Sequence, residues 1–265
     1  MAITTLDGAL AGMMPPQNII KVSAATVAGR HYSPFYVAGN PGAATAPSPG
    51  IGGEALTTYT GQIPFTNPVS GNTYLARFSG ACNVAGTLLL CDRLWHNSGI
   101  NVTLNTSQAI DSVAWPARDR NGTTNGADVF IGAEVRTLMG AGTPTFTMEY
   151  TDSDGNAGAT TVTAAQATTM AVGSFIPIQL AEGDVGVRSI QTWRQSATMT
   201  SGAYHLVAYR ILARVGVTSA NIENAVDAIT GGFVRMYANT VPFLLWIPTT
   251  TTAPTIHAQL IVAQG

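Results

Sequence analysis

The feature that most constrains the fold of this chain is a succession of short apolar or alternating runs after Tyr59, each broken by Gly, Pro, Asn or Asp. This pattern is typical of an antiparallel β-sandwich or barrel. Period-two alternation is clearest in residues 145–151, where Phe146, Met148 and Tyr150 share one face and polar residues share the other. The pattern therefore predicts a mainly β protein.

The pattern also predicts where the elements lie. The predicted strands are residues 73–79, 87–95, 128–138, 145–151, 159–164, 174–180, 187–193, 204–215, 243–248 and 256–263. Their number suggests two packed sheets in an antiparallel β-sandwich. One short helix is predicted near residues 219–229, with Ser219 as N-cap, an apolar stripe of Ile222, Val226 and Ile229, and a stop at glycines 231 and 232.

The first part of the chain has a different character. Residues 1–14, MAITTLDGALAGMM, have the pattern of a short helix that Pro15 and Pro16 end. Its apolar side consists of Leu6, Leu10, Met13 and Met14. A helix this short is not stable alone, so it packs on its own domain or docks on a neighbour as an arm. The glycine- and proline-rich residues 39–53 follow as a loop. We therefore expect an N-terminal arm and linker over residues 1–55 and a β-sandwich domain over residues 56–265.

Charge is scarce in this sequence. Only 10% of the residues are Asp, Glu, Lys or Arg, against about 25% in an average soluble domain, and Lys21 is the sole lysine. Because the centres of subunit interfaces are depleted in charge, this composition favours an obligate oligomer or a subunit of a larger shell. The net charge of −2 with scattered arginines gives no stripe for phosphates, so nucleic acid is not expected as a direct ligand.

Targeting signals and a disulfide framework are not predicted. The longest apolar run, residues 241–248, is too short to span a bilayer, and no charged start followed by an apolar stretch opens the chain. We expect no membrane partner. Cys82 and Cys91 do not form a regularly spaced framework, and both are interpreted as reduced and buried.

The segment LLLCDRLWHNSG, residues 88–99, groups a thiol, a carboxylate, a guanidinium and an imidazole. On a strand, Cys91 and Arg93 point to one face, whereas Asp92 and His96 point to the other. A Cys/His nucleophile pair therefore cannot form within this segment. The favoured interpretation places Cys91 in the core, makes Asp92 and Arg93 polar edge or interface partners, and has His96 begin a turn.

Two further patterns have a structural explanation. TDSDGNAG, residues 151–158, resembles the start of a calcium loop, but Thr163 stands where an EF-hand requires a bidentate glutamate, so a hairpin turn is predicted. The four tryptophans, which offer a sugar-binding surface as the alternative, are interpreted as core residues; they are Trp95, Trp115, Trp193 and Trp246.

No reaction centre emerges from the sequence. The four histidines have no paired spacing, although a metal site built from distant strands, as in cupin-like barrels, remains an alternative. Nucleophile-elbow, phosphate-loop and dinucleotide motifs are not found. We predict no catalytic, cofactor-binding or metal-binding residues, no cofactor, and no enzyme activity.

A resemblance adds to this interpretation. The run from Ile63 to Gly99, IPFTNPVSGNTYLARFSGACNVAGTLLLCDRLWHNSG, resembles tailed-bacteriophage virion structural proteins, in which an FTNP opening, a YLAR strand and a DRLWH strand end recur. The C-terminal strand that finishes in VAQG is also similar. The resemblance is closest to auxiliary capsid proteins, also called decoration or cement proteins, and implies a jelly-roll-like β-sandwich.

The resemblance also implies a function. A cement protein forms homo-oligomers, trimers in particular, and binds the major capsid protein on the outside of the capsid, which it stabilises. It is assembled in the host cytoplasm and located on the virion. In this interpretation Leu6, Leu10, Met13 and Met14 belong to the arm that docks on the capsid. The alternatives are a tail or fibre component with receptor or carbohydrate binding, and a tail tube subunit.

Overall fold

The computed structural model describes residues 5–24, 26–163 and 170–265. The chain forms two compact units. Unit 1 contains residues 1–45, 57–92 and 211–265, and unit 2 contains residues 46–56 and 93–210. Two long strands, β6 (Gly86–His96) and β13 (Ala203–Val217), contribute residues to both units. The arm and linker over residues 1–55 and the domain over residues 56–265 remain a prediction from the sequence.

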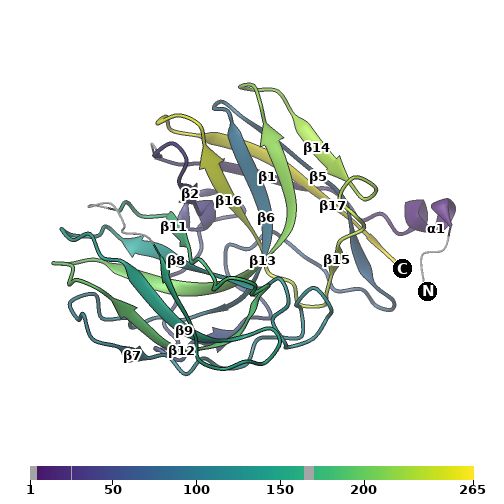
Figure 1. The fold of residues 1–265 in the computed structure, drawn as a ribbon. Helices are drawn as coiled ribbons and strands as arrows, with labels where there is room; N and C mark the ends of the chain where they lie inside the picture. Colours follow the sequence, from purple (N-terminus) through teal and green to yellow (C-terminus); the bar gives the residue numbers. More distant parts are fainter. Residues whose placement is uncertain (1–4, 25, 164–169) are drawn as a thin grey trace. The chain divides into compact units, whose positions relative to one another are not determined.

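Unit 1 is built on an antiparallel sheet with the strand order β14-β5-β17-β1-β3 (Figure 1). Its longest ladder joins β5 (Thr73–Cys82) to β17 (Thr255–Gln264). The other members are β1 (Gln17–Val22), β3 (Gly39–Asn40), β14 (Asn224–Asp227) and β15 (Arg235–Met236), which pairs with β5. β16 (Pro242–Pro248) pairs with β6 and with β2 (His31–Tyr32), which the 3₁₀ turn η1 (Pro34–Tyr36) follows.

The core of unit 1 lies on one face of this sheet. Residues on the core side of this ladder, including Leu75, Phe78 and Leu260, are buried at 1% exposure or less, and a β-bulge between Leu75 and Arg77 brings Leu75 and Phe78 to the same side. They pack with Leu88 and Leu90 of β6 in the same hydrophobic cluster. Strand alternation therefore gives each strand of this sheet one core face and one outward face.

Unit 2 has its own antiparallel sheet, with the strand order β10-β9-β12-β7. These strands are β7 (Gln108–Ala109), β9 (Phe146–Asp152), β10 (Ala159–Thr163) and β12 (Val187–Gln195). β8 (Phe130–Thr137) pairs with β11 (Ser174–Pro177) and with residues 203–209 of β13, and β4 (Glu54–Ala55) pairs with the end of β6. A second hydrophobic core fills this unit.

The mainly β, antiparallel class predicted from the sequence is confirmed. Phe146, Met148 and Tyr150 are each fully buried, as the alternation in residues 145–151 predicts. The four tryptophans are all core residues at 2% exposure or less, so none of them offers a face on which a sugar ring stacks. Cys82 and Cys91 are buried and free, as expected.

The predicted hairpin at residues 151–158 is also confirmed. β9 and β10 pair across it, and the Asp152 carboxylate accepts hydrogen bonds from the backbone N–H groups of Asp154 and Asn156, each at 2.9 Å. Gly155 has a φ of 93°, a conformation that glycine adopts without steric cost. The side-chain amide of Asn156, which donates to the same carboxylate at 2.8 Å, and these backbone hydrogen bonds hold the pKa of Asp152 below its usual value. Ala164, the last residue of the predicted strand, lies outside the described residues.

The predicted helix at residues 219–229 is wrong. This segment contains β14, whose residues Asn224–Asp227 pair with β5. Ile222 and Ile229, two members of the expected apolar stripe, are 56% and 78% exposed. Val226, the third member, is partly buried against the core of unit 1. The edge of β5 offers backbone groups for the segment to pair with, and the β-branched residues of the segment suit a strand.

Candidate functional site

The four residues of the predicted arm lie in and just after α1 (Leu6–Ala11), the helix at the start of unit 1. Thr5 caps this helix, because its side chain accepts a hydrogen bond from the N–H of Gly8 at 3.0 Å. Asp7 lies in the first turn, where the helix dipole favours a negative charge. The part of the arm formed by residues 1–4 lies outside the described residues.

The segment after α1 is attached to the end of β17. The N–H of Met14 donates to the carbonyl oxygen of Val262 at 2.9 Å, and the N–H of Gln264 donates to the carbonyl oxygen of Gly12 at 2.8 Å. Gly12 is needed at this contact because a Cβ atom there would lie 2.1 Å from the Gln264 oxygen. The backbone pairing therefore fixes the base of α1 on the sheet.

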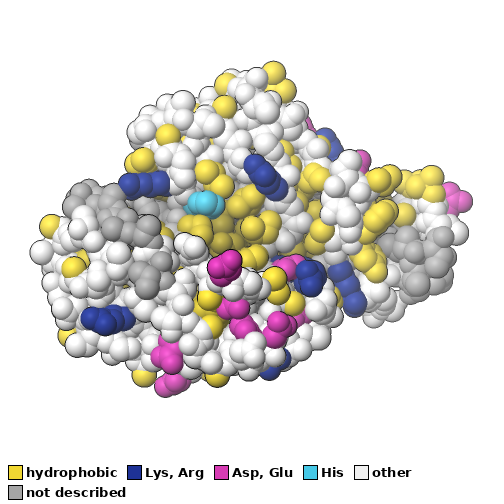
Figure 2. Space-filling view, in the orientation of Figure 1, with side chains coloured by type: hydrophobic (Ala, Val, Ile, Leu, Met, Phe, Trp, Pro, Cys, Tyr) yellow, Lys and Arg dark blue, Asp and Glu magenta, His cyan; other side chains and the backbone are white. Residues whose placement is uncertain are grey.

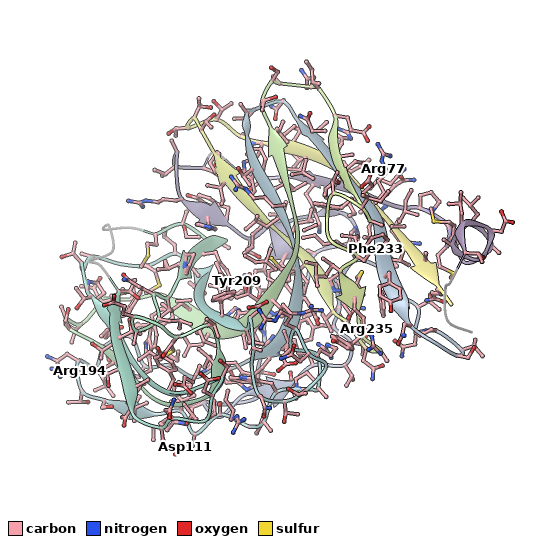
Figure 3. All side chains as sticks on the ribbon, turned by 45° about the vertical axis from the view of Figure 1, so that its right-hand side comes forward. Arg77, Asp111, Arg194, Tyr209, Phe233 and Arg235 are labelled. Atoms are coloured by element: carbon pink, nitrogen blue, oxygen red, sulfur yellow. The ribbon has the colours of Figure 1, made fainter. Side chains whose placement is uncertain are left out.

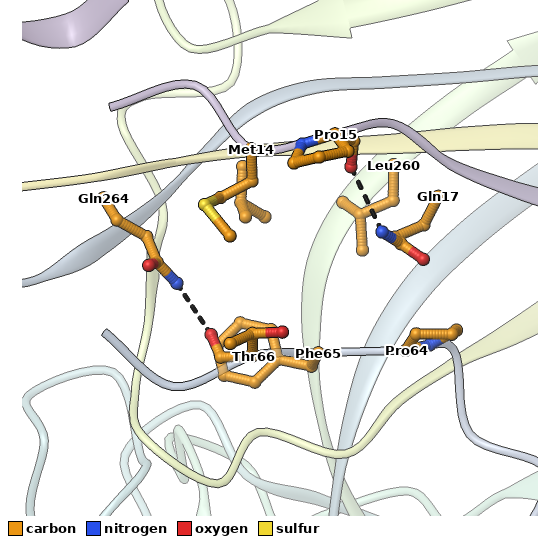
Figure 4. A pocket seen from close by; sticks show the side chains of 9 residues that line it. Met14, Pro15, Gln17, Pro64, Phe65, Thr66, Leu260 and Gln264 are labelled. Atoms are coloured by element: carbon orange, nitrogen blue, oxygen red, sulfur yellow. Dashed lines mark hydrogen bonds between the residues drawn. The ribbon is translucent and has the colours of Figure 1, made fainter. Parts of the chain in front are cut away.

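Met14 differs from the other arm residues because it faces a small internal space (Figure 4). This cavity of about 30 Å³ also has Pro64, Phe65 and Leu260 in its wall. The side-chain amide of Gln264 donates to the carbonyl oxygen of Thr66 at 2.7 Å at its edge. A space of this size holds no more than a water molecule, so Met14 contributes to packing rather than to a ligand site.

Leu6, Leu10 and Met13, by contrast, are open to solvent. Their exposed fractions are 75%, 61% and 41%, and α1 has no buried residue. Hydrophobic side chains gather around α1 on the surface shown in Figure 2. The helix lies near its own sheet without burying its apolar side there.

These side chains form one wall of an open groove of about 470 Å³, which we call the apolar groove. None of its lining residues is charged; they are Leu6, Ala9, Leu10, Met13, Tyr74, Leu75, Ala76, Ala228, Phe233 and Ala263. The groove thus combines α1, β5, the end of β17 and the turn between β14 and β15. Contiguous apolar surface of this kind on a protein marks an interaction site.

Phe233 is the groove residue that sequence reasoning missed. It is 60% exposed and has a φ of 54°, a left-handed conformation that is strained for a bulky side chain. The N–H of Phe233 donates to the carbonyl oxygen of Ala228 at 2.8 Å, so the turn fixes the backbone of this residue. Figure 3 shows Phe233 between Arg77 and Arg235 along this side of the sheet. An aromatic residue held in a strained, exposed position is a functional candidate.

A second unexpected feature lies inside unit 2, where Arg93, His96, Glu134 and His205 form a buried ionic network. A guanidinium nitrogen of Arg93 lies 2.8 Å from Oε2 of Glu134, and both side chains are fully buried. The same Glu134 oxygen lies 2.7 Å from Nε2 of His205. The charges of Arg93 and Glu134 therefore compensate each other inside the core of the unit.

The network reaches the surface of unit 2 through His96. Nε of Arg93 donates to Nδ1 of His96 at 3.3 Å, and Nε2 of His96 lies 3.0 Å from a carboxylate oxygen of Glu54. The Glu54 side chain is 49% exposed. Since Nδ1 accepts from Arg93, a neutral His96 carries its proton on Nε2 and donates it to Glu54.

The environment of the two imidazoles opposes their protonation. Burial, followed by the positive charge of Arg93, lowers the pKa of His96 to about 2. Burial also lowers the pKa of His205, although the hydrogen bond and the negative charge of Glu134 act in the opposite direction. Both imidazoles are neutral at physiological pH.

This network corrects two predictions for residues 88–99. Arg93 and His96 were expected on opposite faces of a strand, but their side chains are hydrogen bonded. The pairing of β6 with β16 ends at Asp92 and its pairing with β4 begins at Trp95, so β6 exchanges one partner strand for another around Arg93. Asp92 and Arg93 were expected at an edge or interface, but both are fully buried, because each has buried partners within its own unit. Cys91 lies in the core as predicted.

The residues of this network come from distant parts of the sequence. No sequence motif contains His96 together with His205 or Glu134, so sequence reasoning could not predict their contact.

In the described parts of the chain, no three His, Cys, Asp or Glu side chains are grouped in a way that would hold a metal ion. None of the described helices is long and apolar enough to cross a membrane.

Comparisons with known proteins do not assign a family. No family model and no curated protein matches the sequence. Among solved structures, the chain is similar to VP2 of infectious bursal disease virus in a subviral particle, with a TM-score of 0.23 and 8% identity over 96% of this chain and 80% of that one. A structure of the Gt strain of the same virus has a TM-score of 0.20 and 9% identity, over 95% and 80% of the two chains. Likenesses this distant define neither a family nor a function.

Proposed function

We propose that this chain is a structural protein of a tailed-phage virion that binds the outside of the capsid and stabilises it as a decoration protein. The observation that carries the proposal is the apolar groove with the exposed helix α1. Leu6, Leu10 and Phe233 leave more than half of their side-chain surface in water. Such surface is costly for a free protein and useful for one that is bound in an assembly.

Burial of apolar side chains in many copies of the chain would supply the binding free energy. Complete burial of one Leu or Phe side chain contributes about 1.5 to 3 kcal/mol. Contacts from a few such residues are individually weak, because association also costs translational and side-chain entropy. A homotrimer attached through three identical arms gains from a high effective concentration once the first arm is bound. The chain's partners in this proposal are sister copies and the major capsid protein.

The scarcity of charge supports the same role. With 10% charged residues, the chain has little electrostatic repulsion to keep copies apart. The resemblance of residues 63–99 to phage structural proteins supports a virion location, reached after assembly in the host cytoplasm.

Removal of α1 tests the proposal. A deletion of residues 1–11 removes the helix and keeps the backbone pairing of Gly12 and Met14 with β17, so the fold is expected to persist. Binding to purified capsids, measured by co-sedimentation, is expected to be lost while the oligomer remains intact. The longer deletion of residues 1–16 is expected to have the same effect on binding.

Retention of full capsid binding by both deletions would contradict the docking role of the arm. Immunogold labelling of purified phage particles separates the capsid location from the alternatives. Gold particles on the tail, the tail tube or the fibres would contradict the decoration role and would support a tail, tail tube or fibre component instead.

A further inference from the structure

The buried ionic network occupies a position where a change in protonation acts on one unit only. Its members come from β6, β8 and β13, and every one of them belongs to unit 2. Arg93, His96 and Glu134 have no exposed surface, and His205 is 3% exposed. A charge that appears on these side chains lies in the interior of unit 2, and the contact of His96 with Glu54 links it to the surface.

We propose that this network makes unit 2 selectively acid-sensitive, so that mild acid opens unit 2 while unit 1 stays folded. In the folded state the network contains one fixed positive and one negative charge, held 2.8 Å apart. A proton added to either imidazole gives a second positive charge beside Arg93. Glu134 contacts both Arg93 and His205 and is already paired with Arg93, and a guanidinium nitrogen of Arg93 also lies 2.9 Å from Nε2 of His205.

Several further charged groups lie beside the network. They include Glu54 on β4, Arg136 on β8, and Arg118, whose guanidinium donates to the carbonyl oxygen of Arg93 at 3.1 Å. Two of these three are cations. Glu54 contacts His96 but is half exposed, and water screens its charge.

The direction of the pH effect follows from proton binding. An unfolded histidine has a pKa of about 6.5, whereas the pKa values of His96 and His205 are lowered in the folded unit. Below about pH 6.5 the unfolded state therefore binds more protons than the folded state. The stabilisation is complete at neutral pH and is lost as the pH falls.

The size of the effect distinguishes the two units. Each histidine that stays neutral in the folded state changes the unfolding equilibrium constant by about tenfold per pH unit, so two give about 100-fold. In unit 1, burial lowers the pKa of His31. His257 of unit 1 is exposed. Acid is therefore expected to weaken unit 1 by no more than about tenfold per pH unit.

Hydrogen exchange of the full chain, read by mass spectrometry between about pH 7 and about pH 4.5, tests this proposal. After correction for intrinsic exchange rates, protection of β8 and β12 is expected to fall about 100-fold per pH unit and that of β5 and β17 much less. The double variant His96→Gln/His205→Gln is expected to lose this steep dependence in unit 2. The matched control His257→Gln is expected to keep it.

Equal pH dependence in the two units, or an unchanged dependence in a folded double variant, would overturn the proposal. If the double variant does not fold, an NMR titration of the imidazoles in the unaltered protein decides instead. Two imidazoles that remain neutral well below about pH 6 support the proposal. Titration of His96 and His205 near about pH 6.5 in the folded protein overturns it.

Discussion

Lys21 shows at the scale of one residue how this chain uses its rare charges. Its side chain is buried, and the ammonium donates to the carbonyl oxygens of Val37, Pro41 and Gly42 at 2.8, 2.7 and 3.2 Å. Burial lowers its pKa to about 8. Lys21 therefore satisfies three backbone acceptors of the segment that follows η1. The sequence shows that Lys21 is the sole lysine, but it does not predict this structural role.

Substitution of this lysine tests that interpretation. Lys21→Met keeps the length of the side chain but leaves three carbonyl groups without their donor, and an unsatisfied buried group costs about 1 to 3 kcal/mol. We expect the free energy of unfolding of unit 1 to fall by roughly 2 to 4 kcal/mol, measured by chemical denaturation.

Arg30→Met is the matched control. Arg30 is an exposed cation of the same unit, and a surface substitution of this kind changes stability by about 0.5 kcal/mol or less. An equal loss in the two variants would show that the carbonyl contacts of Lys21 are not the source of its effect.

At the scale of elements, α1 and β14 illustrate opposite outcomes of the same reasoning. Both segments have apolar residues at helical spacing. α1 is a helix because Thr5 caps it and Gly12 and Met14 attach its end to β17. Asn224–Asp227 forms a strand because the edge of β5 is available for pairing. α1 follows its local pattern and cap, whereas a tertiary partner overrode the local pattern in β14.

The exposed side of α1 can be tested without removing the helix. The double variant Leu6→Ser/Leu10→Ser takes away apolar groups that are mainly in water, so the unfolding temperature is expected to remain almost unchanged. Capsid binding is expected to weaken at least tenfold in a co-sedimentation titration, because the variant loses the surface buried on docking.

Val69→Ser serves as the control for this pair. Val69 is fully exposed and is not among the groove residues. Its substitution is expected to leave both stability and capsid binding intact. If Val69→Ser also loses capsid binding, the loss follows from replacing any exposed apolar side chain by a polar one and is not specific to α1.

At the scale of the whole molecule, the scarcity of charge has a consequence for self-association. Subunit contacts in such a chain depend mainly on apolar burial, which salt does not screen. We expect the purified protein to form homo-oligomers, as three copies of 27.5 kDa in the proposed trimer, and to keep this mass at high salt. Sedimentation velocity at low and high ionic strength measures this; a monomer at both would contradict it.

The mainly β, antiparallel fold class of this protein could be predicted from the sequence. Alternating or continuous apolar runs identified the longer strands of both units, since successive residues of a strand lie on alternate faces whatever its partner is. The strands β1, β2, β3, β4, β7, β14 and β15 were not predicted. The turn at residues 151–158 and the burial of the cysteines and tryptophans were also predictable, because they depend on local backbone geometry or on apolar character.

The tertiary structure alone decided the features that join distant residues. The meeting of Arg93 with Glu134 and His205, and of α1 with Phe233, depends on which strands pair and in which register. A period-two pattern states which residues share a face, but it does not name the strand that faces them. Pairing free energy is distributed over the whole sheet, so such contacts are determined only when the complete chain has folded.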